Sequence, residues 1–246
     1  MGLDWTLNHD TCISYAFTID SFLPTACAMN SKQSLIVYDR VGLSHSGKRI
    51  FASFSLQVKV GEKVLLGGAS GSGKSSLLKM LLGFVKPTEG TLSFKGTLLD
   101  EKQVWEVRKK IAYVDQGSCL GAGRVTDLID FIFSLKANHA IRLVDERVDE
   151  LLAYFHLDRG LLDKSIEHLS GGERQRMALV IAVLLERKVF LLDEVTSGLD
   201  KQLKQKVVDF FVTNPEWTCL IVSHDPIWSG HEDIRTHTLE ERLCKQ

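Results

Sequence analysis

The sequence predicts an α/β protein with a mixed, mainly parallel sheet, an antiparallel β subdomain and an inserted helical subdomain. Three observations predict this class. A strand pattern, a glycine-rich turn and a helix pattern follow one another over residues 64–82. Uninterrupted apolar runs at residues 189–192 and 219–222 are typical of central parallel strands that are buried on both faces. Between these parts, residues 117–168 carry apolar residues at helical spacing.

The composition is that of an ordinary globular protein. The chain has 246 residues, of which 44% are hydrophobic and 25% charged, so it can bury a large core. A net charge of −1 and the lack of a Lys/Arg block argue against a nucleic-acid partner. Five scattered cysteines form no Cys-x-x-Cys pair, and no apolar run reaches the roughly 18 to 20 residues of a membrane span. Residues 1–34 are expected to be an N-terminal extension rather than a targeting signal.

The first half of the chain is expected to open with antiparallel strands. Residues 54–60 alternate apolar and polar side chains, which predicts a strand with one wet face. The strands expected before the helical segment are residues 35–38, 54–60, 64–66, 91–94 and 111–114. The last of them leads directly to Gln116, at the edge where α/β proteins hold ligands.

The glycine-rich turn fits the phosphate-binding pattern G-x-x-x-x-G-K-[ST] from Gly68 to Ser75. Glycines let the backbone approach phosphate oxygens, while Lys74 adds a positive charge and the Ser75 hydroxyl is placed to ligate Mg²⁺. A nucleoside triphosphate with magnesium is the expected ligand. A Gly/Ser-rich surface turn is the alternative, and it does not explain Lys-Ser at this offset between a strand and a helix. The candidate phosphate-binding residues are Gly68, Ala69, Ser70, Gly71, Ser72, Gly73, Lys74, Ser75 and Ser76.

A glycine pair, Gly171 and Gly172, stands just ahead of the helical run of residues 174–185. Ser170 and Glu173 form a capping-box pattern, which by itself predicts a well-made helix start. Gly171 and Gly172 are not explained by a cap, since glycine costs entropy in a helix. They bare backbone N–H groups that could hold a second phosphate-type anion.

Polar residues follow the two apolar strands of the second half. Asp193 and Glu194 end one strand, and two adjacent carboxylates there predict a cation or a catalytic water between them. The last expected strand, residues 219–222, is followed by His224 at the same edge of the sheet.

These motifs, in this order, resemble the nucleotide-binding subunit of ATP-binding cassette (ABC) transporters, over residues 35 to about 239. The specific signal is Leu-Ser-Gly-Gly-Glu at residues 169–173, which matches the signature motif of that family. The resemblance implies a P-loop NTPase core within an ABC ATPase domain at residues 35–246.

The resemblance also implies roles for single residues. Lys74 and Ser75 would bind the phosphates and Mg²⁺, and Asp193 would hold Mg²⁺ through water. Gln116 would sense the metal and the attacking water, Glu194 would be the general base, and His224 would contact the γ-phosphate. His45 stands where the family usually stacks an aromatic ring on adenine, with Phe51 as the alternative.

The partners follow from the same resemblance. Two copies would pair head to tail, so that each ATP lies between one phosphate loop and the other copy's Ser170, Gly171 and Gly172. A separate integral membrane permease would dock on residues 117–168, which places the protein in the cytoplasm at a membrane face. Val195 before Thr196 favours exporter-like relatives, and the resemblance is greater to small stand-alone ATPase subunits, including iron exporters, than to fused ones. The alternatives are a soluble ABC-type ATPase of DNA repair or translation and a P-loop kinase outside the family.

Overall fold

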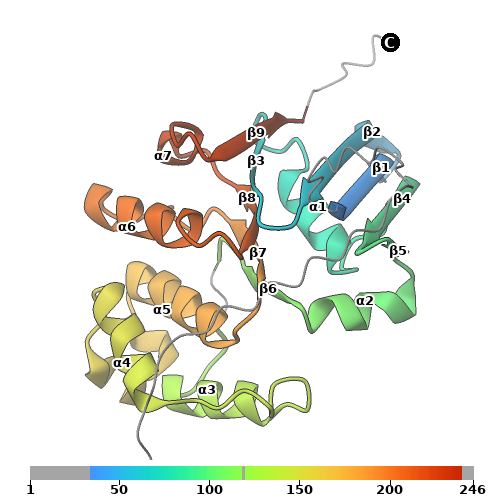
Figure 1. Ribbon diagram of the computed structural model, residues 1–246. Helices are drawn as coiled ribbons and strands as arrows, with labels where there is room; N and C mark the ends of the chain where they lie inside the picture. The colour runs from blue at the N-terminus through green and yellow to red at the C-terminus, as the bar shows by residue number, and fades with distance from the viewer. Residues whose placement is uncertain (1–33, 118–119, 240–246) are drawn as a thin grey trace, which may run out of the picture. The chain divides into compact units, whose positions relative to one another are not determined.

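The structure is a computed structural model that describes residues 34–117 and 120–239. Its strands form two sheets, an antiparallel one in the order β2-β1-β4-β5 and a parallel one in the order β6-β7-β8-β3-β9. Figure 1 shows the parallel sheet between α5 and α6 on one side and α1 with the antiparallel sheet on the other. The predicted fold class is confirmed, with the antiparallel strands in a sheet of their own. The predicted N-terminal extension lies almost wholly outside the described residues.

The strands are β1 (Ser34–His45), β2 (Lys48–Lys59), β3 (Lys63–Gly67), β4 (Glu89–Phe94), β5 (Thr97–Leu98), β6 (Ile111–Val114), β7 (Val189–Asp193), β8 (Thr218–Val222) and β9 (Ile234–Thr238). The α-helices are α1 (Lys74–Leu81), α2 (Glu101–Arg108), α3 (Val125–Ser134), α4 (Asp145–Tyr154), α5 (Gly171–Leu184), α6 (Lys201–Val212) and α7 (Pro226–Ser229). Two short 3-10 helices, η1 (Arg159–Asp163) and η2 (Ile166–His168), lie before α5.

The parallel sheet is buried on both faces because its central strands carry unbroken apolar runs, residues 64–66, 189–192 and 219–222. In β7, Phe190 and Leu192 pack on the side of α5 and α6, whereas Val189 and Leu191 pack on the side of α1. Successive side chains of a strand point to opposite faces, so an unbroken apolar run supplies both cores. The sheet thereby holds the carboxyl ends of β3, β7 and β8 at one fixed edge.

Helix α1 connects the two sheets. Its Leu77, Leu78 and Leu81 are fully buried, and the Tyr38 hydroxyl of β1 donates a hydrogen bond to the Leu77 carbonyl over 2.9 Å. Burial also raises the pKa of Tyr38, which keeps the hydroxyl protonated as a donor. The helix that follows the phosphate loop is therefore clamped between both sheets.

Some predicted boundaries and elements differ from the structure. The loop helix begins at Lys74 rather than at residue 76, because the first turn includes the Lys-Ser pair. Residues 219–222 are not the last strand, since β9 pairs in parallel with β3 at the edge of the sheet. Helices α2 and α6 were not predicted. Among the helices of the described residues, none is both long enough and apolar enough to cross a bilayer.

Candidate active site

The phosphate loop joins β3 to α1 and lies at the carboxyl edge of the parallel sheet. Gly73 caps α1 with a φ of +98°, and a Cβ there would meet the Phe51 ring at 2.8 Å. Gly68 has a φ of +134°, and a Cβ there would meet the Leu239 carbonyl oxygen at 3.1 Å. A side chain is strained at either position, so glycine is required by backbone conformation and by close packing alike.

Lys74 is 5% exposed, and its ammonium group lies inside the loop. It donates hydrogen bonds to the carbonyl oxygens of Gly68, over 2.8 Å, and Ala69, over 2.7 Å. His224 Nε2 lies 3.4 Å from the same nitrogen. Burial lowers the pKa of Lys74, and the nearby carboxylates of Glu194 and Asp193 oppose that shift. Among the described residues, the ammonium group is thus held mainly by backbone oxygens that a phosphate group could replace.

Ser75 and Asp193 face each other across the edge of the sheet. The Ser75 hydroxyl donates to Asp193 Oδ1 over 2.9 Å, and the Tyr113 hydroxyl lies 3.4 Å from Asp193 Oδ2. Burial raises the pKa of Asp193, while the hydrogen bonds from Ser75 and Tyr113 oppose this shift. Carboxylate and hydroxyl oxygens are the donors that Mg²⁺ prefers, so this pair fits the predicted magnesium site.

Glu194 has a left-handed backbone conformation with a φ of 52°, which is uncommon for a residue other than glycine. Its N–H donates to the Val222 carbonyl over 2.8 Å, and its own carbonyl accepts from the Ser197 N–H over 3.0 Å. The carboxylate accepts a 3.3 Å hydrogen bond from the His224 N–H and lies 3.8 Å from His224 Nε2. The backbone strain is held by these bonds and turns Glu194 toward His224 and Lys74.

Not every predicted site residue is joined to this cluster. Gln116 is exposed in the turn after β6, and no hydrogen bond in the described part of the chain links it to Asp193 or Glu194. His45 is exposed at the end of β1. Phe51, the alternative to His45 for adenine stacking, is only 5% exposed and packs edge-on against Phe54, so it has no free face.

The predicted capping box is present at the start of α5. Glu173 N–H donates to Ser170 Oγ over 3.2 Å, and Ser170 N–H donates to the Glu173 carboxylate over 2.8 Å. A Cβ on Gly171 or Gly172 would meet no atom within 4 Å. Nothing in the described chain therefore demands glycine at these two positions.

Tyr113 and Ser223 contact the site, although the sequence did not single them out. Tyr113 reaches Asp193, and the Ser223 hydroxyl lies 3.4 Å from the Glu194 carboxylate. Both residues stand near the carboxyl ends of predicted strands, and that position was the available signal.

A strand, a glycine loop that caps a helix, and a paired serine and aspartate define a P-loop nucleotide-binding protein. The profile of the ABC transporter family matches residues 51–197, which is more than half of the chain. The chain belongs to that family, as its nucleotide-binding, ATP-hydrolysing subunit.

Relatives of known name share most of the chain. The probable iron export ATP-binding protein FetA of Escherichia coli (strain K12) is 32% identical over 211 residues, covering 83% of this chain and 91% of that protein. The ergothioneine transport ATP-binding protein EgtV of Helicobacter pylori (strain G27) is 28% identical over 217 residues, covering 87% of this chain and 100% of that protein. The dimeric structure of a bacterial ABC transporter cassette superposes with a TM-score of 0.71 at 25% identity, covering 83% of this chain and 94% of that one. These relatives do not favour a role in DNA repair or translation.

Proposed function

We propose that the chain binds ATP with Mg²⁺ at the Gly68–Ser75 loop and hydrolyses it to drive a separate membrane permease. The observation that carries this proposal is the convergence of Lys74, Ser75, Asp193, Glu194 and His224 on one edge of the parallel sheet. The protein would work in the cytoplasm, bound peripherally at a membrane face.

The phosphate groups of ATP would displace the loop carbonyls from Lys74 and take the ammonium group as their partner. Ser75 and Asp193 would hold Mg²⁺, with water and phosphate oxygens completing its ligands. Bound Mg²⁺ supplies positive charge that offsets the negative charge on the phosphates. His45 is proposed to stack on adenine, and Gln116 to sense the metal and the attacking water.

Glu194 is proposed as the general base. Its side chain is only 15% exposed, and His224 Nε2 lies 3.8 Å from its carboxylate. Glu194 would accept the proton of the attacking water, and His224 would contact the γ-phosphate. A positioned general base typically contributes about 10² to 10⁴ in rate.

The second half of the site is proposed to come from another copy of the chain. Gly171 and Gly172 have open space where side chains would be, although nothing in the described chain requires that space. A γ-phosphate bound to a second copy would need it, because helix N–H groups bind anions best when no side chain intervenes. In a head-to-tail homodimer, each copy would place its Gly171 and Gly172 beside the ATP of the other copy.

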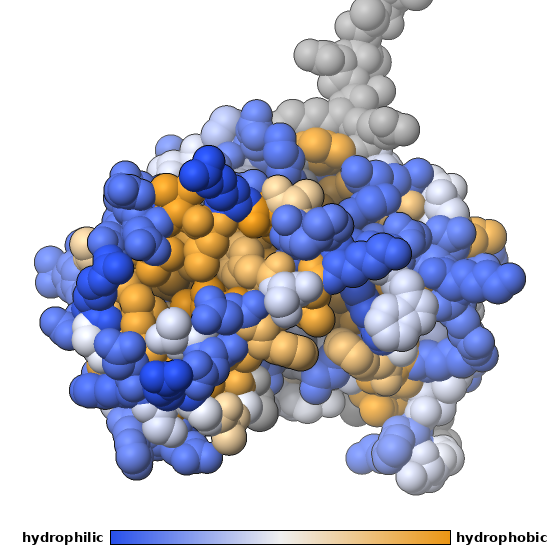
Figure 2. Space-filling view, turned by 90° about the horizontal axis from the view of Figure 1, so that it is seen from below, coloured by the Kyte–Doolittle hydropathy of each residue, from blue (hydrophilic) through white to orange (hydrophobic). Residues whose placement is uncertain are grey.

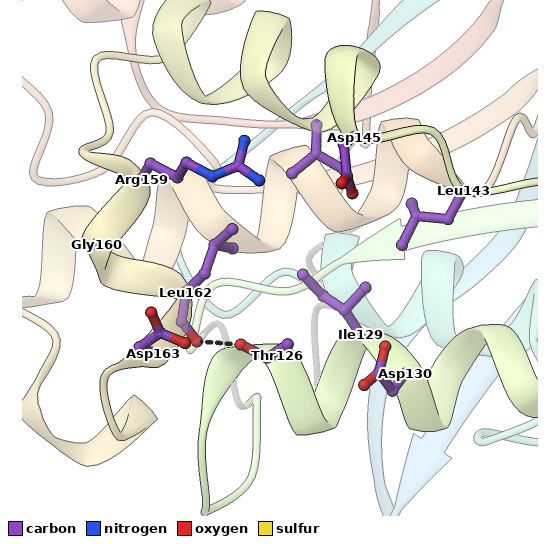
Figure 3. A pocket seen from close by; sticks show the side chains of 10 residues that line it. Thr126, Ile129, Asp130, Leu143, Asp145, Arg159, Gly160, Leu162 and Asp163 are labelled. Atoms are coloured by element: carbon purple, nitrogen blue, oxygen red, sulfur yellow. Dashed lines mark hydrogen bonds between the residues drawn. The ribbon is translucent and has the colours of Figure 1, made fainter.

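The permease is proposed to dock on the helical segment, residues 117–168. A hollow of about 430 Å³ lies between α3, α4 and η1, with Ile129, Leu143 and Leu162 in its lining (Figure 3). Figure 2 shows apolar surface gathered in a hollow on the face seen from below. The hollow between α3, α4 and η1 is also lined by three aspartates, against one cation, Arg159; the aspartates are Asp130, Asp145 and Asp163. Cytoplasmic loops of membrane proteins carry excess Lys and Arg, so an acidic and apolar hollow suits such a loop.

The proposed direction of transport is export, and the first cargo to test is a metal ion such as iron. This rests on Val195 before Thr196 and on the name of the E. coli relative. Metal content of cells with and without the chain and its permease would test it, and unchanged metal content would exclude this cargo.

Glu194→Gln tests the proposed function. The variant should keep ATP binding, lose about 10² to 10⁴ of the hydrolysis rate, and accumulate as a dimer, because the bound ATP is no longer removed. Size-exclusion chromatography with saturating ATP and Mg²⁺ measures the dimer. Glu232→Gln, an exposed change outside the site, is the matched control. Monomeric elution of Glu194→Gln would contradict the shared site.

A further inference from the structure

A second cavity lies at the opposite edge of the parallel sheet from the phosphate loop. It has a volume of about 220 Å³ and lies where α5 ends, where β7 and β8 begin, and where α4 starts. We call it the basic pocket, and its lining residues are Arg142, Leu143, Val144, Arg147, Val183, Leu184, Glu186, Arg187, Lys188 and Trp217.

Positive charge dominates the basic pocket. Four of its lining residues are cationic and only Glu186 is acidic, in a chain whose net charge is −1. Arg147 is paired with Glu150 at 3.0 Å, and Lys188 with Glu216 at 2.8 Å. Arg142 and Arg187 have no carboxylate within ion-pair distance among residues 34–117 and 120–239. Two cations of the pocket thus lack an ion pair, and Glu186 is the single carboxylate among the lining residues.

Of Arg142 and Arg187, Arg187 is the one whose guanidinium group is held by hydrogen bonds to the described chain. Its guanidinium group donates to the side-chain oxygen of Asn138 and, over 3.5 Å, to the carbonyl oxygen of Ala137. Asn138 is 6% exposed and donates in turn to the Ile132 carbonyl over 2.8 Å. Burial lowers the pKa of Arg187, but a guanidinium group stays charged in proteins, so the cost of its burial remains. An anion in the pocket would offset that cost.

The remaining lining residues of the basic pocket include an apolar group built around Trp217. Trp217 packs at ring-centre distances of 4.7 Å from Phe190 and 5.7 Å from Phe211. Leu143, Val183 and Leu184 complete this apolar group. A ligand that fits must therefore combine a negative group with an apolar body, and the planar fork of arginine is suited to phosphate and carboxylate groups.

We propose that the basic pocket binds a small organic anion, whose phosphate or carboxylate group pairs with Arg142 and Arg187 and whose apolar part lies against Trp217. This site is separate from the nucleotide site. Lys188 lines the pocket just before β7, whereas Asp193 is the last residue of that strand, and the five steps between them span roughly 16 Å at about 3.3 Å per residue. The inference does not depend on ATP hydrolysis.

Phenyl phosphate is the probe for a first test, titrated calorimetrically into the full-length protein with ADP and Mg²⁺ saturating the nucleotide site. We expect saturable binding that weakens about tenfold or more in Arg187→Gln and also weakens in Arg142→Gln. Phenol and inorganic phosphate should each bind more weakly than phenyl phosphate. Arg142 is exposed, so its substitution keeps the test valid if Arg187→Gln folds poorly. Lys86→Gln, an exposed cation outside the pocket, is the matched control.

A phosphate group with an apolar body could come from a soluble metabolite or from a lipid headgroup. Vesicles of phosphatidylcholine with about 20% phosphatidate distinguish these sources by co-sedimentation. Sedimentation that is lost in Arg142→Gln and Arg187→Gln assigns the anion to a lipid, whereas saturable phenyl phosphate binding without sedimentation assigns it to a soluble ester. If neither probe binds, or if both arginine variants bind like the wild type, the proposal is wrong.

Discussion

Lys74 has hydrogen-bond partners within the phosphate loop even when no nucleotide is bound. Its ammonium group is nearly inaccessible to water and is bonded to two carbonyl oxygens of its own loop. On ATP binding, the ammonium group would therefore exchange these carbonyl oxygens for phosphate oxygens; it is not without hydrogen bonds beforehand. Such an exchange favours phosphate, because a charged acceptor forms a stronger hydrogen bond to an ammonium group than a neutral carbonyl does.

Lys74→Ala should lose both ATP binding and hydrolysis. The substitution removes the only full positive charge that the loop aims at the phosphates, so affinity should fall about 100-fold or more. Binding of a fluorescent ATP analogue and release of inorganic phosphate measure the two losses. Lys86→Ala, an exposed cation beyond the end of α1, should behave like the wild type. Unchanged affinity in Lys74→Ala would contradict the assigned phosphate site.

Cys219 should resist alkylation in the folded protein. It is fully buried in β8, and burial raises the pKa of its thiol to about 12. Because the unfolded thiol ionises first, this group's contribution to stability is complete below about pH 9 and is lost as the pH rises toward 12. Iodoacetamide labelling at about pH 8.5, mapped by mass spectrometry, should modify Cys219 only after denaturation. Rapid labelling of the native protein would contradict the burial of this strand.

Helix α5 combines a structural role at its N-terminus with the binding role that we propose for its glycines. Its capping box stabilises the monomer, whereas neither packing nor backbone conformation in the described chain requires glycine at residues 171 and 172. A structural role and a binding role can therefore be separated by substitutions one residue apart.

Gly171→Ala should separate these roles. The monomer should be as stable as the wild type or more stable by about 0.5 kcal/mol, because a Cβ meets no atom and alanine loses less entropy in a helix. ATPase activity should nevertheless fall at least about tenfold if Gly171 faces a second copy's nucleotide. Ser170→Ala should instead cost about 1 kcal/mol of unfolding free energy. Chemical denaturation and phosphate release measure both effects, and full activity in Gly171→Ala would oppose the shared site.

Local patterns explain which elements and residues were predictable. The phosphate loop, Gly68–Ser75, is recognised by its residue pattern, and Asp193 and Glu194 by their place after an apolar strand. The sequence therefore predicted the central residues of the site. Helix α2 was missed because only Val107 is buried in it, which leaves no apolar stripe. Strand β9 was missed because only Ile234 is buried in it, so it has no apolar run.

Long-range contacts were not predictable from the sequence. The bond from Tyr113 to Asp193 depends on β6 pairing with β7 across 80 positions. Phe51 could not be excluded as the adenine-stacking residue until its ring was seen packed beneath Gly73. The spacing of residues along the chain shows neither which distant side chains touch nor which rings are buried.

In the whole molecule, the nucleotide site lies at the carboxyl edge of the parallel sheet, and the candidate permease site lies between α3, α4 and η1. The hollow between α3 and α4 is acidic at its rim, so charge should govern docking there. The double variant Asp130→Lys and Asp163→Lys should reduce co-purification with the cognate permease about tenfold while leaving basal ATPase activity unchanged. The double variant Glu232→Lys and Asp233→Lys, which makes the same charge change at exposed residues outside the hollow, is the control. Equal recovery of the permease with the double variant would move the docking surface elsewhere.

The order of strands in the parallel sheet constrains how the protein can be made. Strand β3 feeds the phosphate loop, yet its two neighbours are β8 and β9, from the far end of the chain. A ribosome that has synthesised the loop must still add more than 140 residues before β3 has a strand partner, because Lys63 pairs with Cys219 of β8 and Ile234 of β9. We therefore expect that the nascent chain cannot bind ATP before β8 has been synthesised, because β3 has no partner in the parallel sheet until then. Stalled chains released before residue 218 should accordingly fail to bind an ATP affinity resin.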